Sequence, residues 1–323
     1  MCRNIAIGID IGGTNTVLGF VDEKGNYLLG NTIPTYPKQD AKKFVSRLVE
    51  FINEQKNKHF ENDHLTGIGV AAPSANHFSG TIETPYNLNW RYVKFVDMLK
   101  DYFDLPVAIT NDANAAALGE LAFGNAVNMK NFIMLTLGTG LGSGIIINGS
   151  ILYGKNGHAG EMGHMTVIPN GRECACGRCG CLETYVSAKG LKRTVYNMLS
   201  KYREESELRN INYNELTGEK ITKAALNDDY IALKSFEYTS EILGKFMANI
   251  TACFEPEAFI LFGGMAEAGD LLLEPARKHF EENLLEVYKG KVAILKSKFK
   301  DGKAAVLGAC SLVAHKTKFL QRR

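Results

Sequence analysis

Four cysteines and a histidine lie close together and form a candidate metal site. His164 precedes Cys174, Cys176, Cys179 and Cys181. Thiolates and an imidazole at this spacing suit a tetrahedral ion of intermediate softness, for which zinc is the default choice. Disulfide bonds are the alternative, but bonds between cysteines so close in sequence would be strained. The sequence also gives no sign of secretion, which disulfide bonds would favour. Spacing alone leaves two ligand sets open: the four cysteines, or His164 in place of Cys179.

A glycine turn near the start of the chain is a candidate phosphate-binding loop. Asp10 is followed by Gly12, Gly13, Thr14 and Asn15. Glycines let backbone N–H groups approach phosphate oxygens, and the last two side chains add donors. Asp10 is a candidate for holding Mg²⁺ through water. No Lys follows as in a Walker loop, and a plain hairpin is the alternative.

A second turn of the same kind, Gly138-Thr139-Gly140, follows about 125 residues later. Each turn lies between two apolar runs, so strand, glycine turn and strand occur twice. The repeat predicts two related α/β domains that face each other across a cleft; two unrelated hairpins are the alternative. Further on, Gly263-Gly264 ends an apolar run. The two glycines would let a flat group such as adenine approach the backbone closely; a tight turn between a strand and a helix is the alternative.

Several carboxylates and an amide stand at positions suited to binding or proton transfer. Asn111-Asp112 lies between an expected strand and an alanine-rich helix, where Asp112 is either a general base or a helix cap. Glu161 and Glu183 flank the cysteine run. If His164 and Cys181 share a metal, both glutamates are rigid acceptors suited to a polyhydroxylated ligand; solvated loop charge is the alternative.

The elements that would position these groups alternate along the chain. We expect strands at 5–11, 16–21, 27–33, 68–71, 107–110, 132–137, 143–147 and 258–262. We expect helices at 40–55, 93–102, from 113, and at 183–199, 230–253, 271–286 and 304–318. Segment 201–227 is polar and shows no clear pattern.

Bulk properties exclude several classes of protein. A chain of 323 residues with 45% hydrophobic and 22% charged residues is long enough for two globular domains. A net charge of +2 gives no reason to expect a nucleic-acid or membrane partner. No apolar stretch approaches the roughly eighteen residues of a membrane span. The N-terminal apolar run is too short for a signal peptide, so we expect a cytoplasmic protein with reduced thiols.

Taken together, these motifs closely resemble the ROK family of repressors, open reading frames and kinases. The resemblance covers nearly the whole chain, and the cysteine motif is highly specific. It is carried by Asp10-Ile11-Gly12-Gly13-Thr14, Asn111-Asp112, Leu137-Gly138-Thr139-Gly140-Leu141-Gly142, Glu161-Met162-Gly163-His164, the run from Cys174 to Glu183, and Gly263-Gly264. It implies the two-domain actin-like ATPase (ribonuclease H-like) fold with a central cleft.

The resemblance also implies an ATP-dependent hexose kinase, with glucose as the expected substrate and a homodimer as the expected assembly. Asp112 would deprotonate the sugar 6-hydroxyl, and Asn111, Glu161, His164 and Glu183 would bind sugar hydroxyls. ATP and Mg²⁺ would lie at the two glycine turns and at Gly263-Gly264. Many members have Pro-Gly where this chain has Pro73-Ser74. Because that loop helps line the sugar site, Asn76 and Asn87 are weaker candidates there.

We expect a small domain of residues 1–112 plus 304–323 and a large domain of 113–303. Alternatives are a kinase for N-acetylglucosamine or N-acetylmannosamine, and a sugar-responsive regulator. Family repressors carry a DNA-binding domain ahead of the kinase-like fold, and here the first strand is expected from Ile5. A third alternative, a sugar-binding relic without transferase activity, is disfavoured because Asp112 is present.

For the metal, we predict a structural zinc ion bound by His164, Cys174, Cys176 and Cys181, with Cys179 a spare thiol. Four thiolates around the ion would leave a formal charge of −2, whereas the set with His164 leaves −1 and ties the metal to the sugar loop. In the family pattern, the position that Cys179 occupies here is not a metal ligand.

Overall fold

The computed structural model describes residues 2–85, 87–300 and 302–317, which form two compact units. Unit 1 contains the residues up to Asn128, Gly149–Ala159, and those from Lys298 on. Unit 2 contains Met129–Asn148 and Gly160–Ser297. This division counts 113–128, 149–159, 298–300 and 302–303 with the N-terminal part, whereas the sequence prediction counted them with 113–303. Residues 318–323 of the predicted small domain lie outside the described residues.

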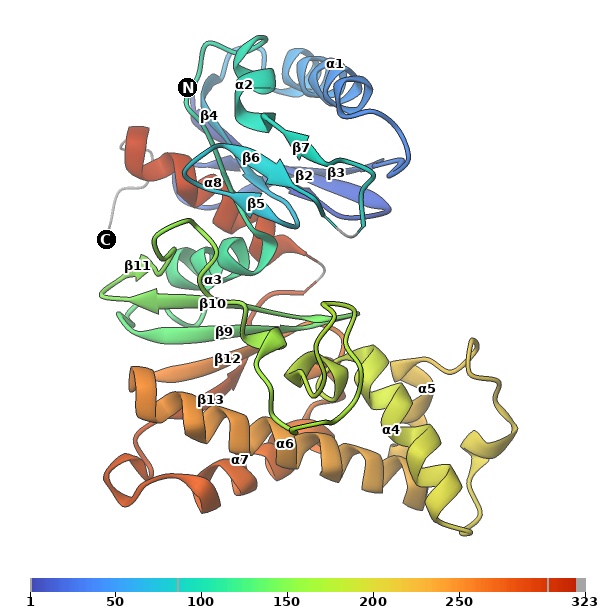
Figure 1. Cartoon of the computed structure of the whole chain (residues 1–323). Helices are drawn as coiled ribbons and strands as arrows, with labels where there is room; N and C mark the ends of the chain where they lie inside the picture. Colours follow the sequence, from blue (N-terminus) through green and yellow to red (C-terminus); the bar gives the residue numbers. More distant parts are fainter. Residues whose placement is uncertain (1, 86, 301, 318–323) are drawn as a thin grey trace. The chain divides into compact units, whose positions relative to one another are not determined.

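Unit 1 is built on a five-stranded sheet in the order β3-β2-β1-β4-β8, of which Figure 1 labels β2, β3 and β4. Strands β1 and β2 are antiparallel, and β4 and β8 run parallel to β1. The bounds are β1 Asn4–Ile11, β2 Asn15–Asp22, β3 Tyr27–Pro34, β4 His64–Ala71 and β8 Val107–Thr110. A small sheet of β5 Ala75–Asn76, β6 Thr81–Glu83 and β7 Tyr92–Val93 was not predicted, because its strands are very short.

Helices α1 (Ala41–His59) and α2 (Phe95–Lys100) pack against one face of this sheet through an apolar core. The isoleucines of β1 point into that core. On the other face, helix α8 (Lys303–Thr317) lies directly on β1 and β4 and contacts α3 (Asp112–Phe123). The close approach requires glycine: a Cβ at Gly69 would lie 1.7 Å from the Ala309 carbonyl oxygen.

Unit 2 repeats the topology of the first sheet, with the order β10-β9-β12-β13. Strands β9 and β10 are antiparallel, and β12 and β13 run parallel to β9. The bounds are β9 Phe132–Leu137, β10 Leu141–Ile147, β12 Ala258–Phe262 and β13 Ala293–Lys296; the short β11, Ser150–Ile151, belongs to unit 1. The mixed α/β architecture predicted from the sequence is confirmed.

The helices of unit 2 surround α6 (Tyr230–Phe254), which contacts α4 (Ala188–Lys201), α5 (Gly218–Leu226) and α7 (Asp270–Asn283). Short 3₁₀ turns complete the unit: η1 Met162–His164, η2 Leu182–Thr184, η3 Glu207–Asn210, η4 Ala266–Ala268 and η5 Glu286–Tyr288.

Several predicted helix boundaries were wrong. The helix predicted at 183–199 starts later, because the Ser187 side chain caps it by accepting from the Gly190 N–H at 3.0 Å. The helix predicted at 93–102 is shorter, since its first residue belongs to β7. Position 318, the predicted end of the last helix, lies outside the described residues. None of the helices in the described ranges is long and apolar enough to cross a membrane.

Candidate active site and metal-ligand cluster

The four groups of one predicted ligand set lie together in unit 2. Ligand atoms of His164, Cys174, Cys176 and Cys181 all lie within 4.8 Å of one another. The Cys174 Sγ atom is 3.6 Å from His164 Nδ1, and the Sγ atoms of Cys176 and Cys181 are also 3.6 Å apart. Cys179 is exposed and outside the group. The geometry favours the set with His164 over the four-cysteine set.

The spacing of these atoms fits a tetrahedral zinc ion. Zn–S bonds of about 2.3 Å and a Zn–N bond of about 2.0–2.1 Å require S···S separations of about 3.8 Å and N···S separations of about 3.5 Å. The two distances of 3.6 Å are close to both values. Three thiolates and one imidazole are also donors that zinc prefers. The donor set therefore suits a zinc ion, and these two separations agree with its tetrahedral dimensions.

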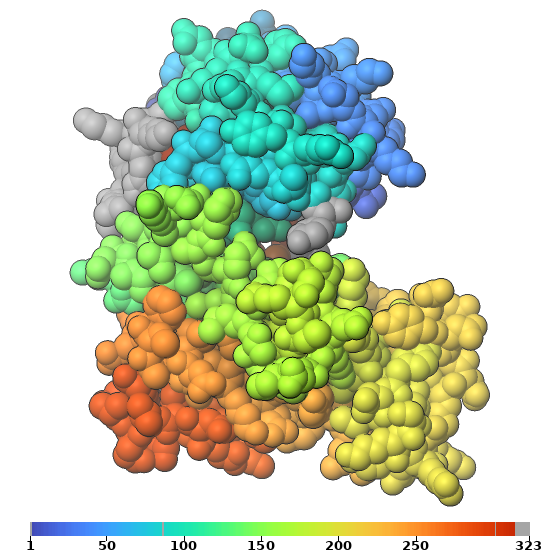
Figure 2. Space-filling view, in the orientation of Figure 1, coloured from blue at the N-terminus to red at the C-terminus, as the bar shows by residue number. Residues whose placement is uncertain are grey.

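A tight loop holds the ligands on the surface of unit 2, in the segment coloured yellow-green in Figure 2. His164 ends η1 and Cys181 directly precedes η2. The Arg178 guanidinium donates a hydrogen bond to the His164 carbonyl. Gly180 has a φ of +79°, and a Cβ there would lie 1.8 Å from the Ile168 carbonyl oxygen. Only glycine fits at this point, so the close turn before Cys181 depends on it.

The three clustered thiols have very different proton affinities. Burial and the neighbouring thiols raise the pKa of Cys181 to about 12. At Cys176, desolvation is outweighed by hydrogen bonds from the Arg178 backbone, from Cys174 and from the Arg178 side chain, and the pKa falls to about 6. Three adjacent thiolates repel one another, so a bound cation would be needed to keep all of them ionised.

Glu183 joins the metal loop to the second glycine turn. Its Oε2 atom accepts a hydrogen bond from the Leu141 N–H at 2.9 Å. A Cβ at Gly140 would lie 2.3 Å from that oxygen, so the turn and the carboxylate are in direct contact. The other oxygen, Oε1, lies 4.0 Å from Cys174 Sγ. Glu161, the second predicted acceptor, precedes η1 and is exposed.

In unit 1, the helix cap that the sequence left open for Asp112 is provided by Asn111. Asn111 is the N-cap of α3, and its Oδ1 atom accepts from the Asn114 N–H at 2.7 Å. Asp112 is the first helical residue, and its Oδ1 accepts from the Ala113 N–H at 2.9 Å. Because Asn111 caps the helix, the helix start does not require the Asp112 carboxylate as its cap.

Two carboxylates of unit 1 lie at the same sheet edge. Asp10 is near the end of β1 and Asp112 follows β8, and both strands run parallel to β4. Desolvation, and then the charge of Asp112, raise the pKa of Asp10 to about 7. Desolvation also raises the pKa of Asp112, although part of this residue stays exposed. Carboxyl ends of parallel strands are where α/β proteins bind ligands.

The first glycine turn is closed by a hydrogen bond from the Gly12 N–H to the Asn15 carbonyl at 3.0 Å. Thr14 and Asn15 are exposed. A Cβ at Gly13 would lie 2.9 Å from the Cβ of Asn87, so Asn87 packs against this turn. The structure thus brings one weaker sugar-site candidate next to the candidate phosphate loop.

The second glycine turn is tighter and is closed by a backbone hydrogen bond from the Gly138 N–H to the Gly140 carbonyl at 3.0 Å. Thr139, between them, is exposed. Gly263 has a φ of +101°, and a Cβ there would lie 2.7 Å from the Leu137 carbonyl oxygen. The structure therefore places Gly263 beside the second glycine turn, with Gly264 exposed next to it.

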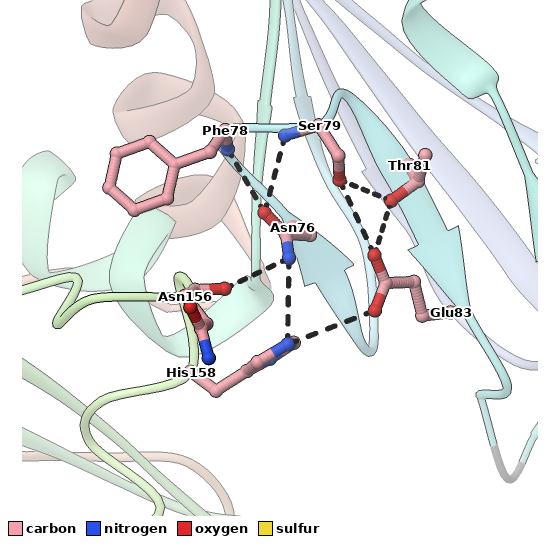
Figure 3. A network of polar contacts seen from close by, with 7 residues as sticks. All are labelled: Asn76, Phe78, Ser79, Thr81, Glu83, Asn156 and His158. Atoms are coloured by element: carbon pink, nitrogen blue, oxygen red, sulfur yellow. Dashed lines mark hydrogen bonds and ion pairs between the residues drawn. The ribbon is translucent and has the colours of Figure 1, made fainter.

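This chain has Pro73-Ser74 where many family members have Pro-Gly, and the backbone conformation at this position explains why glycine is common there. Ser74 has a φ of +53°, a left-handed conformation that glycine adopts at little cost. Asn76 follows in β5 and is buried, with its side-chain amide bonded to protein groups (Figure 3). The polar network around Asn76 was not predicted, because its partners are distant in sequence.

The predicted site residues thus fall into two groups. Unit 1 contains the carboxylates Asp10 and Asp112, the first glycine turn, and the three asparagines at 76, 87 and 111. Unit 2 contains the second glycine turn, Gly263-Gly264, both glutamates and the whole metal-ligand cluster. The two carboxylates of unit 1 and both glycine turns lie at the ends of central strands. Asn76 lies in β5 of the small sheet, and the metal ligands lie between β11 and α4.

The chain matches known proteins along nearly its whole length. The model of the ROK family matches residues 6–316. A glucokinase of Halalkalibacterium halodurans is 37% identical over 85% of this chain and 84% of its own length. A glucokinase of Streptomyces coelicolor is 34% identical over 95% of this chain and 97% of its own. A xylose repressor of Caldicellulosiruptor bescii is 30% identical over 95% of this chain and 77% of its own.

Solved structures agree with these sequence relatives. A ROK family glucokinase from Streptomyces griseus, in complex with glucose and AMPPNP, has a TM-score of 0.79 and 33% identity. The alignment covers 95% of this chain and 98% of that one. A ROK family transcriptional regulator has a TM-score of 0.88 at 24% identity, which shows the fold alone. The two-domain actin-like sugar kinase fold predicted from the sequence is confirmed, and this chain belongs to the ROK family.

Proposed function

We propose that this protein transfers the γ-phosphoryl group of ATP to the 6-hydroxyl of a hexose, and that glucose is its main substrate. The observation that carries the proposal is Asp112. This carboxylate follows a central strand, its pKa is raised by desolvation, and the neighbouring Asn111 caps the helix. A base with a raised pKa is suited to accepting a proton near neutral pH. The glucokinases reported above support glucose as the hexose.

In this mechanism, Asp112 accepts the proton of the 6-hydroxyl as the sugar oxygen attacks the γ-phosphorus. The bond from oxygen to phosphorus forms, the bond to the ADP oxygen breaks, and the proton remains on Asp112. The backbone N–H groups of the two glycine turns bind the phosphates. When bound, magnesium would supply charge neutralisation at the phosphates, and Asp10 is the residue that would hold it, through water. Gly263 and Gly264 border the nucleoside.

Sugar recognition is assigned to Asn111, Glu161, His164 and Glu183, with Asn87 at one edge. Glu183 is suited to the task because the Leu141 N–H fixes one of its oxygens at 2.9 Å. A carboxylate held in this way can accept from sugar hydroxyls without losing much rotamer entropy.

We assign the metal-ligand cluster to a structural zinc ion held by His164, Cys174, Cys176 and Cys181. The ion would fix the loop between Glu161 and Glu183, which both flank the ligands in sequence. It would have no part in phosphoryl transfer. The expected homodimer and the cytoplasmic location remain predictions.

An assay of ATP consumption over a panel of hexoses tests the proposal. Glucose, N-acetylglucosamine, N-acetylmannosamine and mannose are compared at equal concentration with Mg²⁺, and the sugar product is identified by mass spectrometry. We expect glucose 6-phosphate with the highest kcat/KM. A higher kcat/KM for an acetylated sugar would change the substrate and leave the mechanism intact.

The second candidate is a sugar-responsive regulator, favoured by the 30% identity to the xylose repressor. A regulator of this kind would bind sugar without consuming ATP. Calorimetric binding of glucose or xylose, combined with no ATP turnover on any hexose of the panel, would favour it over the kinase.

A further inference from the structure

Asn76 is the centre of a hydrogen-bond network in unit 1. The residue is buried, and its Oδ1 atom accepts from the backbone N–H groups of Phe78 at 3.0 Å and Ser79 at 3.3 Å. Its Nδ2 atom donates to the Asn156 carbonyl at 3.0 Å (Figure 3). The Oδ1 atom has two protein donors, and the two N–H groups of Nδ2 face the Asn156 carbonyl and, at 3.5 Å, His158 Nε2. A direct bond to sugar would therefore require Asn76 to give up a partner.

The network joins the β5–β6 hairpin to the loop at 153–159. His158 Nε2 lies 3.5 Å from Asn76 Nδ2 and 3.8 Å from Glu83 Oε2. Glu83 is itself oriented by hydrogen bonds from the hydroxyls of Thr81, at 2.6 Å, and Ser79, at 3.3 Å. Since His158 is exposed and is charged only when protonated, its contact with Glu83 contributes little. The bond from Asn76 to the Asn156 carbonyl is partly buried and is the main polar tie across these two segments.

The next residue, His77, extends the network toward the candidate base. Its Nδ1 atom lies 2.9 Å from the Ile109 carbonyl, which can only accept, so Nδ1 carries the proton. The His77 ring stacks on Tyr153 at a centroid distance of 4.4 Å and an interplanar angle of 6°. Ile109 lies in β8, two residues before Asn111. His77 therefore connects the strand that leads to Asp112 with the start of the 153–159 loop.

The loop itself is shaped to meet Asn76. Gly157 has a φ of +85°, and a Cβ there would lie 2.9 Å from Asn76 Oδ1. The Ala159 N–H donates to the Tyr153 carbonyl at 3.0 Å, which closes the loop. The chain then passes through Gly160, whose carbonyl accepts from the Ser143 hydroxyl, into Glu161. A loop fixed by Asn76 thus ends two residues before a carboxylate assigned to the sugar.

We propose that Asn76 is a positioning residue: by anchoring the 153–159 loop to the hairpin after Pro73-Ser74, it sets the place of Glu161 and hence the affinity for sugar. This inference rests on the proposed function. His77 assists by fastening Tyr153 to the strand before Asn111. Asn76 itself makes no bond to the substrate, so it governs sugar affinity and leaves phosphoryl transfer to Asp112.

The test removes the Nδ2 donor of the bond to Asn156 and keeps the shape of the side chain. Asn76→Asp still accepts from the Phe78 and Ser79 N–H groups, but it turns an oxygen toward the Asn156 carbonyl. The substitution is made in a His158→Ala background, because the imidazole would otherwise offer the new carboxylate a donor. Relative to His158→Ala alone, we expect the glucose KM to rise about tenfold, with kcat and the ATP KM within about twofold.

Hydrogen exchange provides a readout that is independent of catalysis. The Ala159 amide should exchange faster in the double variant than in His158→Ala. Asn57→Asp, which adds the same charge on an exposed face of α1, should match the wild type in both assays. If the double variant fails to fold, Gly157→Ala is used in its place, because the added Cβ would lie 2.9 Å from Asn76 Oδ1 and disturb the same contact. The glucose KM and the Ala159 exchange rate are then measured for this variant.

The outcomes separate the two proposals. An unchanged glucose KM with faster loop exchange would overturn the positioning role, and unchanged exchange would overturn the anchor itself. A wild-type protein that phosphorylates no hexose would contradict the proposed function, and the exchange comparison would still decide whether Asn76 anchors the loop.

Discussion

The two glycine hairpins have the same topology and different chemistry. In unit 1, β1 and β2 flank Gly12-Gly13, and in unit 2, β9 and β10 flank Gly138-Thr139-Gly140. In each sheet two further strands run parallel to the first strand of the hairpin. Yet the first hairpin has an acid, Asp10, two residues before its first glycine, where the second has Thr136.

The difference shows how a repeated fold is divided between tasks. Unit 1 gathers Asp10 and Asp112, whose pKa values are both raised by desolvation, and is suited to handling protons and metal-bound phosphates. Unit 2 ties its glycine turn to Glu183, and through that residue to the metal-ligand loop, and is suited to fixing hydroxyl groups. The repeat supplies the scaffold, and a few side chains at equivalent strand ends decide the chemistry.

The largest expected effect comes from removing the base of unit 1. Asp112→Asn keeps the shape and the bond to the Ala113 N–H, but cannot take the sugar proton. We expect kcat to fall by roughly 10²–10⁴-fold, while glucose binding measured by calorimetry changes little. Near-normal turnover would show that Asp112 is a structural residue of the helix start and that the base lies elsewhere.

In unit 2, the matched pair Cys176→Ser and Cys179→Ser tests the metal loop. Cys176 lies in the cluster and Cys179 is exposed outside it. We expect Cys176→Ser to lose zinc and to raise the sugar KM, because the loop between the two glutamates loses its anchor. Cys179→Ser should retain one zinc per chain, measured by metal analysis. Zinc loss from Cys179→Ser together with retention in His164→Ala would establish the four-cysteine site instead.

A third pair of variants compares positions within the second glycine turn. A Cβ at Gly140 would lie 2.3 Å from Glu183 Oε2, whereas one at Gly138 meets nothing within 4 Å. Gly140→Ala should displace Glu183 from the Leu141 N–H and raise the sugar KM roughly tenfold. Gly138→Ala should instead affect the ATP KM, since that residue is assigned to phosphate. Equal changes in both Michaelis constants for both variants would contradict the assignment.

Local patterns predicted much of this molecule. Strands β8, β9 and β12 were placed at their observed bounds, because short apolar runs ended by turn residues are distinctive. The metal ligands could be narrowed to two sets since they lie within a short loop. Helix α5 was missed because it lies in a polar segment. Strand β13 was missed although it is as long as β8, because only one of its four residues is buried, whereas all four residues of β8 are.

What the sequence did not predict depends on contacts between distant residues. Asn76 and Asn156 are 80 positions apart, and no local pattern indicates that their bond forms. Similarly, Asn111 rather than Asp112 caps α3, which only the geometry of the helix start distinguishes. Ser74 was noticed as a departure from the family, but its left-handed backbone required the fold.

The smallest expected effect is on stability, and it tests the acid that distinguishes the first hairpin from the second. The pKa of Asp10 is about 7 in the folded protein, against 3.8 for an unperturbed aspartate, mainly through desolvation. Between about pH 4 and pH 7 the folded state therefore binds more protons at this site than the unfolded state. The resulting stabilisation is complete below the unfolded pKa and is lost as the pH rises to about 7.

Asp10→Asn removes this titration, so the metal-free variant should lose less stability than the wild type between pH 5 and pH 8. We expect a difference on the order of 1–2 kcal/mol in urea unfolding at pH 8, with the variant more stable. This difference in unfolding free energy is smaller than the pKa shift of Asp10 would give by itself, because part of the side chain is exposed to solvent. Asp104→Asn, which removes an exposed carboxylate of the same unit, is the control. Parallel pH profiles for wild type and Asp10→Asn would mean that Asp10 is solvated like an ordinary turn aspartate, and the proposed contrast between the two hairpins would lose its electrostatic basis.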